Sequence, residues 1–146
     1  MLVVTPAFAH EYFFKELAKY VEGDQYVIII PGNFSSLRLL KMIRDLRGVP
    51  LARRVVVAES ASLPYACRLT GKALVTVYTV KDPRAVSLAT VPADGTGETV
   101  EFLKREFYEF KAGDNVLEAT LNNINFLIHS TVSLFTLSLI EYIKGD

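Results

Sequence analysis

The sequence has little cysteine and no sign of export. Cys67 is the only cysteine among 146 residues, so the chain cannot form an internal disulfide. The N-terminus also lacks the basic and apolar regions of a secretory signal peptide. Both observations fit a cytoplasmic protein. Cys67 stands among apolar residues, where a thiol is more often packed than nucleophilic.

An excess of charge is also missing. Sixteen Lys and Arg residues balance sixteen Asp and Glu residues, and no basic run occurs. A nucleic-acid binder carries a basic patch or stripe, so we expect no nucleic-acid partner. The two histidines and the single cysteine form no cluster with the spacing of metal ligands, and we expect no metal site.

Nucleotide-binding motifs are absent as well. No G-x-G-x-x-G turn follows a strand, and Gly95-Thr96-Gly97 stands in a turn-rich stretch after Pro92-Ala93. A P-loop and a G-x-S-x-G motif are also missing. The cofactor-binding residues are therefore unknown from spacing alone.

One apolar run has the length of a membrane-spanning helix, which is about 20 residues. It covers residues 124–143, but Asn125, His129 and Glu141 interrupt it and hydroxyl residues recur along it. These polar residues favour a helix buried in protein over a membrane span, and we expect no membrane partner.

The first part of the chain alternates between short apolar runs and amphipathic stretches. Strands are predicted at 2–5, 26–30 and 55–58. One predicted helix covers 10–21, and a second begins at Ser35 or Ser36, ends at Gly48, and turns Leu39, Leu40, Ile43 and Leu46 inward. The β-α-β-α-β order predicts an α/β fold with a doubly wound, Rossmann-type parallel sheet.

The pattern changes after this unit. Residues 72–81 and 85–91 are β-rich and predict a hairpin or an extension of the sheet edge. Turn residues follow at 91–97, then one amphipathic helix at 98–110 and a long last helix capped by Asp114 or Asn115. We therefore predict an α/β lobe over 1–94 and the start of a helical domain over 95–146.

The last predicted helix carries a polar stripe. On a helical wheel Glu118, Asn122, Asn125, His129, Ser133 and Thr136 fall in one sector, while apolar residues cover most of the rest. Such a helix is expected to be buried, together with its stripe. The stripe either lines a polar substrate pocket or bonds a neighbouring helix or an oligomer partner. His129 is the candidate proton donor, because imidazole exchanges protons near neutral pH.

Other polar residues are candidates for substrate binding, and each also has a purely structural interpretation. Asn33 and Ser60 follow strands and can bind a substrate carboxylate, or they are ordinary turn residues. Arg68 can pair with a carboxylate substrate or with Glu59. His10 begins a helix and is predicted to be a capping or surface group.

Three stretches together resemble the opine (octopine/nopaline-type) dehydrogenase family. They are TPAFAH at 5–10 with PGN at 31–33, AESASLPYACR at 58–68, and NVLEATLNNINFLIH at 115–129. Their order and spacing resemble the family over nearly the whole chain. Family members carry out NAD(P)H-dependent reductive amination of a 2-oxo acid with an amino acid.

The resemblance implies roles for particular residues. His129 would be the catalytic acid/base, and Asn33 and Ser60 would hold substrate carboxylates, with Asn122, Asn125 and Arg68 as further substrate-binding candidates. A proline commonly follows the family's histidine, whereas Ser130 stands there in this chain. The helical part would begin a domain like that of 6-phosphogluconate dehydrogenase.

The resemblance also implies segments that this sequence does not contain. Family members are about twice as long, begin with a glycine-rich turn, and continue beyond the histidine helix. The first hypothesis is an opine-dehydrogenase-like fragment, inactive alone, whose NAD or NADP is bound with the help of a separate chain. The alternative is a non-catalytic small-molecule-binding or self-assembling domain. A cut sheet edge and an apolar last helix predict a homo-oligomer, the simplest being a dimer, in either case.

Overall fold

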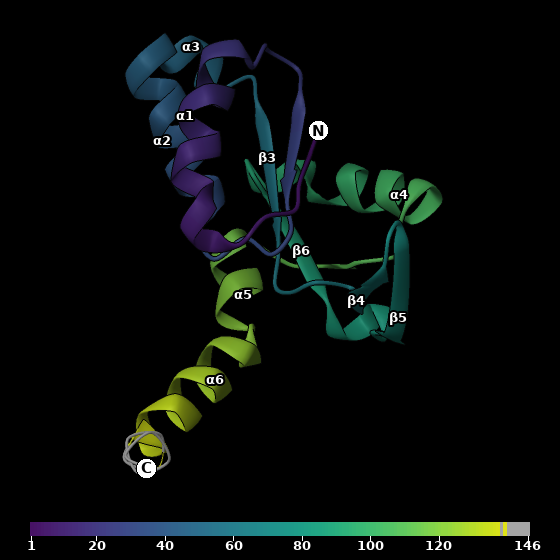
Figure 1. Ribbon diagram of the computed structural model, residues 1–146. Helices are drawn as coiled ribbons and strands as arrows, with labels where there is room; N and C mark the ends of the chain where they lie inside the picture. The colour runs from purple at the N-terminus through teal and green to yellow at the C-terminus, as the bar shows by residue number, and fades with distance from the viewer. Residues whose placement is uncertain (138, 140–146) are drawn as a thin grey trace.

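The structure is a computed structural model that describes residues 1–137 and 139. Figure 1 shows a mixed sheet between helices, with two arms that project from it. The strands are β1 (Leu2–Val3), β2 (Tyr26–Ile29), β3 (Val56–Ser60), β4 (Tyr65–Gly71), β5 (Leu74–Val80), β6 (Ser87–Val91) and β7 (Lys111–Ala112). The helices are α1 (His10–Tyr20), α2 (Ser35–Arg47), α3 (Val49–Ala52), α4 (Thr96–Glu106), α5 (Val116–Leu121) and α6 (Ile124–Phe135), with short 3-10 turns at Ala7–Ala9, Pro83–Ala85 and Ala93–Gly95.

The main sheet has the strand order β1-β2-β3-β6-β7. Strands β1, β2 and β3 are parallel, with Val27 opposite Val57. Strand β6 runs antiparallel to β3, and β7 lies parallel to β6. The predicted α/β fold with a parallel sheet is confirmed, and the sheet becomes mixed beyond β3.

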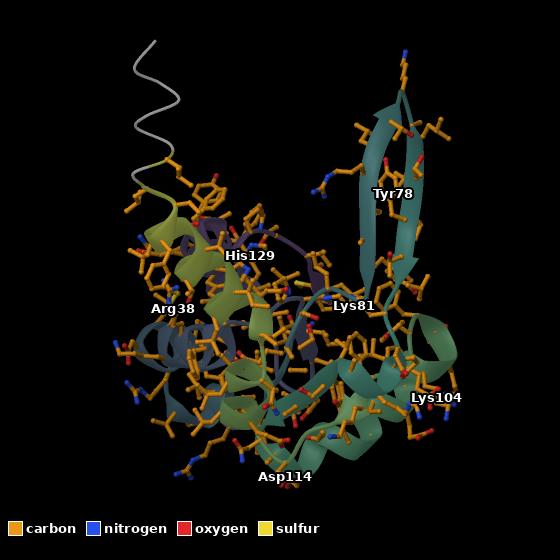
Figure 2. The ribbon with its side chains drawn as sticks, turned by 90° about the horizontal axis from the view of Figure 1, so that it is seen from below. Arg38, Tyr78, Lys81, Lys104, Asp114 and His129 are labelled. Carbon is orange, nitrogen blue, oxygen red and sulfur yellow. The ribbon has the colours of Figure 1, made fainter. Side chains whose placement is uncertain are left out.

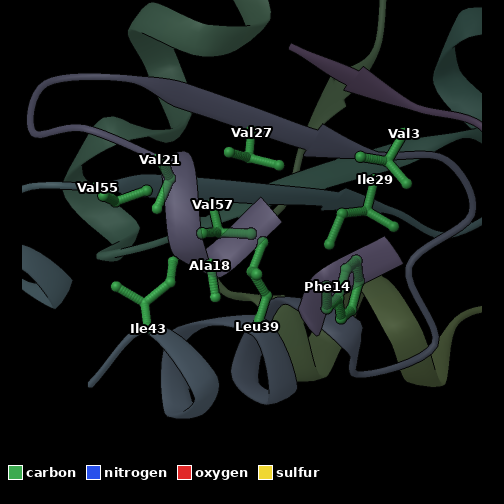
Figure 3. Close-up of a cluster of buried hydrophobic side chains, with 10 residues drawn as sticks. All are labelled: Val3, Phe14, Ala18, Val21, Val27, Ile29, Leu39, Ile43, Val55 and Val57. Carbon is green, nitrogen blue, oxygen red and sulfur yellow. The ribbon is translucent and has the colours of Figure 1, made fainter. Parts of the chain in front are cut away.

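Helices cover both faces of this sheet (Figure 1). Helices α1 and α2 pack on one face around the cluster in Figure 3: Val3, Phe14, Ala18, Val21, Val27, Ile29, Leu39, Ile43, Val55 and Val57. On the other face Val100 and Leu103 of α4 pack against Ile28, Ile30 and Ala58. Successive strand residues therefore point into opposite layers, which explains why the strands are apolar throughout. Of the predicted inward residues of α2, Leu39 and Ile43 are buried, whereas Leu46 is exposed.

The predicted hairpin was paired wrongly. The strand predicted at 72–81 pairs with β4 and not with the strand predicted at 85–91. The latter corresponds to β6, which pairs with β3 in the main sheet. Strand β4 was not predicted, because Arg68 and Gly71 interrupt the apolar pattern of residues 65–71. The division of the chain at residue 94 stays a prediction, although α4 and β7 still pack on the sheet.

The predicted long last helix is broken in two. The Asn115 side chain caps α5 by accepting from Leu117 N and Glu118 N, as expected for one of the two predicted caps. Helix α5 then ends at Leu121, and the Asn123 side chain caps α6 by accepting from Asn125 N at 3.2 Å. The polar stripe therefore does not lie on one continuous helix.

The predicted burial of this helix is correct for part of α5, where Val116, Ala119 and Thr120 are buried, and wrong for the described part of α6. Figure 2 shows α6, which carries His129, and the β4–β5 hairpin, which carries Tyr78, projecting from the body of the molecule. Leu127, Val132 and Phe135 are all exposed on α6. No helix of the described part is long and apolar enough to cross a membrane, and part of the 124–143 run lies outside the described residues.

Candidate functional site

The carboxyl ends of the three parallel strands meet at one edge of the sheet. Thr5 follows β1, Pro31 to Phe34 follow β2, and Ser60 ends β3 with Ser62 just after it. This is the edge at which open α/β sheets bind ligands, because the strand-to-helix loops form a crevice there. Polar side chains gather at this edge, and most of them are buried.

Glu59 is the centre of this polar group. It is fully buried, yet its carboxylate has several donors. Oε2 accepts from Ser36 N at 2.8 Å, and Oε1 accepts from Phe34 N at 3.2 Å and from the Thr120 hydroxyl. The two amides belong to the start of α2, where backbone N–H groups lack helical partners and a carboxylate is favoured. The predicted serine caps of α2 are therefore replaced by Glu59.

The loop after β2 fits tightly around this carboxylate. A Cβ on Gly32 would lie 2.2 Å from the Glu59 Cβ, so only glycine fits there. Asn33 and Phe34 both have left-handed backbones, with φ of 54° and 62°. Asn tolerates this conformation, whereas Phe rarely adopts it, and the bond from Phe34 N to Glu59 helps to hold it.

The junction between α5 and α6 is fastened to the same edge. Thr120 of α5 donates to Glu59, and Asn123 Nδ2 donates to Asn33 Oδ1 at 3.4 Å. These bonds join residues that lie far apart in the sequence. They bring the start of α6 to the carboxyl ends of the strands, and Asn125 and His129 follow on the arm that projects from this point.

The predicted substrate residues fall into different environments. Asn33 is half-buried at the strand ends. Asn122, Asn125 and His129 lie along the α5–α6 arm, and all three are exposed. Ser60 is buried, and its hydroxyl donates to the Ser62 carbonyl at 3.0 Å. Arg68 is exposed on the hairpin and donates to the Cys67 carbonyl. The structure brings Asn33 to the α5–α6 junction, and it leaves Arg68 on the separate hairpin.

Two alternatives from the sequence are wrong. Arg68 does not pair with Glu59, because Glu59 is enclosed by the start of α2 and by Thr120. Cys67 is not packed but exposed, because it lies on a hairpin with both faces in solvent.

Lys81 is a site residue that the sequence reasoning missed. Its Nζ donates to the Ser62 hydroxyl at 2.9 Å, next to the end of β3. Figure 2 shows it at the base of the hairpin. The local sequence does not indicate that Lys81 lies beside Ser62, because this proximity depends on the pairing of β4 with β5.

His10 was predicted to be a capping or surface group, and it is neither. Its side chain is fully buried, with Nδ1 2.7 Å from Ser35 Oγ and Nε2 3.0 Å from the Thr5 carbonyl. It also stacks on Phe14. Burial lowers the pKa of His10 and Arg38 lowers it further, while the Thr5 carbonyl and Glu59 oppose the shift.

This environment predicts a loss of stability in mild acid. The unfolded chain takes up a proton on His10 below about pH 6.5, whereas the folded chain resists it. We therefore expect the free energy of unfolding to fall as the pH decreases from about 7.5 to about 5. Urea denaturation at several pH values measures it. His129→Ala should retain this slope and His10→Gln should lose most of it; an equal slope in both variants would contradict the assignment.

The glycines of the described chain do not form a dinucleotide phosphate turn. Gly32 is closed off by Glu59, so its backbone cannot approach a pyrophosphate. Gly95 and Gly97 stand at the start of α4 beside the acidic residues Asp94 and Glu98, which disfavour an anion. Residues 1–137 and 139 also contain no group of three His, Cys, Asp or Glu side chains that could hold a metal ion.

Comparison with known proteins finds opine dehydrogenases, in sequence and in fold. It is 30% identical to the opine dehydrogenase of Arthrobacter sp. (strain 1C) over 135 residues, which is 92% of this chain. The fold matches octopine dehydrogenase in its complex with NADH and L-arginine, with a TM-score of 0.63 and 25% identity over 86% of this chain. Over most of its own length the chain is therefore similar to opine dehydrogenases.

This relation to the opine dehydrogenases is partial in length. The chain spans 36% of the Arthrobacter protein and 32% of the octopine dehydrogenase chain. A second octopine dehydrogenase structure, with NADH and agmatine, matches with a TM-score of 0.61 and 24% identity, and supports the fold alone. No protein-family model matches the chain.

Proposed function

We propose that this chain forms the substrate side of an opine-dehydrogenase-type oxidoreductase. The reaction would join an amino acid to a 2-oxo acid by NAD(P)H-dependent reductive amination. His129 would move protons, and Asn33, Ser60, Asn122, Asn125 and Arg68 are the candidates for binding substrate carboxylates. The similarity to the Arthrobacter opine dehydrogenase supports the reaction class.

The attachment of the α5–α6 junction to the strand ends is the observation that carries this proposal. Asn123 bonds Asn33, and Thr120 bonds Glu59, so the helical arm begins at the carboxyl edge of the sheet. A ligand bound at this edge would meet Asn33 on the sheet side and the start of α6 on the other. Among these groups, Asn33 and Asn125 supply amide donors for a carboxylate.

His129 has a chemical task in the condensation that precedes reduction. When an amine adds to a 2-oxo acid, the carbonyl oxygen leaves as water and must be protonated. An imidazole can donate this proton and take one from the attacking amine near neutral pH. His129 lies on the exposed arm, so it is accessible to a substrate. In an assembly that also holds the cofactor, replacing His129 should therefore lower activity without lowering the stability of this chain.

The cofactor would be NAD or NADP, and we propose that this chain alone does not hold it. The described glycines give no phosphate-binding turn, so we propose that a glycine-rich segment outside the described residues, on this or another polypeptide, provides it. The edge strand β1 and the cavity of about 490 Å³ beside it, lined by Tyr26, Glu98 and Phe102 among others, are where such a segment could extend the sheet. A non-catalytic binding or self-assembling domain is the second candidate, favoured by the exposed apolar arm.

Calorimetric titration tests the cofactor part of this proposal. Titrating the purified chain with NADH and with NADPH should give no heat above dilution. A micromolar dissociation constant would contradict it. The absorbance of NADH, followed with pyruvate and a panel of amino acids, should show no oxidation by the chain alone.

We propose that the protein is cytoplasmic. We also propose that it assembles as a homo-oligomer. The exposed apolar residues of α6, such as Leu127 and Phe135, are surfaces that an oligomer would cover.

A further inference from the structure

All residues of the β4–β5 hairpin except Tyr65 at its base are exposed. Every residue of β5 is exposed, among them Val77 at 52% and Tyr78 at 65%. The two strands form a sheet of their own, and no third strand of the described chain joins it. An isolated two-stranded hairpin is marginally stable in water, so a further strand would stabilise it.

Strand β5 of this hairpin has few of the features that protect an exposed edge, and its one irregularity is a break in its register with β4 at Tyr78. Strand β5 reads LVTVYTV and contains no charge, proline or glycine. Proteins usually protect an exposed edge with charged residues, proline or a bulge. In β5 the nearest charges are Lys72 and Lys81, which stand outside the strand at its two ends. The strand is therefore suited to pair with another strand.

The strand is complementary to itself. Its central residue is Val77, so two antiparallel copies overlap fully when Val77 faces Val77 across a two-fold axis. In this register Lys72 of one copy lies opposite Asp82 of the other. Asp82 already pairs with Arg84 of its own chain at 2.7 Å, which holds its pKa at about 2 and keeps the carboxylate charged, so Lys72 of the second copy would join an existing ion pair. Full overlap and charge complementarity thus occur in the same register, which favours a second copy of this chain as the partner.

We propose that two copies of the chain dimerise by antiparallel pairing of their β5 strands, with Val77 at the two-fold axis. The result is a four-stranded sheet. On one face the cross-strand pairs Leu69–Val75 and Cys67–Val77 of each copy form a continuous apolar surface. The proposal specifies the surface of the homo-oligomer proposed above, and it does not depend on the enzymatic activity.

Sedimentation equilibrium of the full chain tests the dimer. Wild-type protein should sediment as a dimer, and Val77→Lys should weaken the dimer by about tenfold or more, because two like charges then face each other. The matched control is Leu69→Lys, on the same face but on β4, the strand away from the proposed interface, which should stay dimeric. A monomeric wild-type chain, or a Val77→Lys dimer as tight as wild type, would overturn the proposal. Equal loss in both variants would indicate face-to-face packing and would also overturn it.

A disulfide cross-link tests the axis even where a lysine variant folds poorly. With Cys67→Ser to remove the native thiol, Val77→Cys should form a disulfide-linked dimer on mild oxidation, because directly opposed residues in a sheet lie within disulfide reach. Leu69→Cys in the same background should remain monomeric on a non-reducing gel. Equal cross-linking of both variants, or none in Val77→Cys, would contradict the pairing. NADH calorimetry on the same samples reports the proposed function separately.

Discussion

Gly32→Ala is expected to destabilise the chain by about 3 kcal/mol or more, because overpacking at this position has no cheap relief. The added Cβ would lie 2.2 Å from the Cβ of Glu59 and 2.6 Å from its Cδ. Glu59 cannot swing away without leaving Ser36 N and Phe34 N without an acceptor. The loop after β2 would have to move, and Asn33 would move with it. Urea denaturation measures the loss.

Gly97→Ala is the matched control for this substitution. A Cβ added to Gly97, which belongs to α4, would have no heavy atom within 4 Å beyond its own helix backbone and chain neighbours. Alanine is preferred to glycine in a helix by up to about 1 kcal/mol, so this variant should be as stable as wild type or more stable. A small loss in Gly32→Ala, no larger than about 0.5 kcal/mol, would show that Glu59 does not close the loop as described.

Glu59→Ala is expected to lower the free energy of unfolding by about 3–5 kcal/mol. The carboxylate serves the start of α2 and the Thr120 hydroxyl, so its loss leaves several buried donors without a partner. Glu59→Gln keeps one acceptor oxygen and should lose less. The bond to Thr120 is also lost in Glu59→Ala, so the attachment of the α5–α6 arm should loosen.

Hydrogen exchange and a charge-matched control separate these effects. Amide hydrogen exchange in α5 should accelerate more in Glu59→Ala than exchange in α4, because Glu59 bonds Thr120 of α5 and no residue of α4. Glu106→Ala, at the exposed end of α4, should change stability by less than about 0.5 kcal/mol. If Glu59→Ala were as stable as wild type, Glu59 would not be the centre of the site.

The parallel part of the fold could be predicted from the sequence, because its strands are buried on both faces. Val27 and Val57 belong to uninterrupted apolar runs, and β-branched residues in such runs predict interior strands. The pairing of β6 with β3 could not be predicted in this way. A local pattern identifies a strand but not its neighbour, and residues 85–91 follow 72–81 so closely that a hairpin was the natural interpretation.

The break between α5 and α6 could not be predicted from periodicity either. Apolar residues continue at helical spacing through Asn122 and Asn123, so a wheel gives one helix. The chain ends α5 there because Asn123 caps α6 and also reaches Asn33. A cap signal inside a periodic stretch was present in the sequence, but only the tertiary contact with Asn33 determines that it is used.

The position of some polar residues at the strand ends could be predicted, whereas their roles stay predictions. Asn33 and Ser60 were selected because polar residues after strands line the ligand edge, and both lie there. Glu59 and His10 were not, since their partners are backbone groups and hydroxyls distant in sequence. A carboxylate at the end of an apolar strand and a histidine at the start of a helix are the only local signs of buried polar residues.

The most direct test of the substrate side is a nuclear magnetic resonance titration of ¹⁵N-labelled chain with pyruvate, the simplest 2-oxo acid. We expect saturable shifts in the side-chain amides of Asn33 and Asn125 and in the His129 ring. Asn33→Gly, which keeps the left-handed backbone, and His129→Ala should each weaken this binding. The absence of any saturable shift, or saturable shifts confined to residues away from the strand ends and α6, would contradict the proposed substrate site.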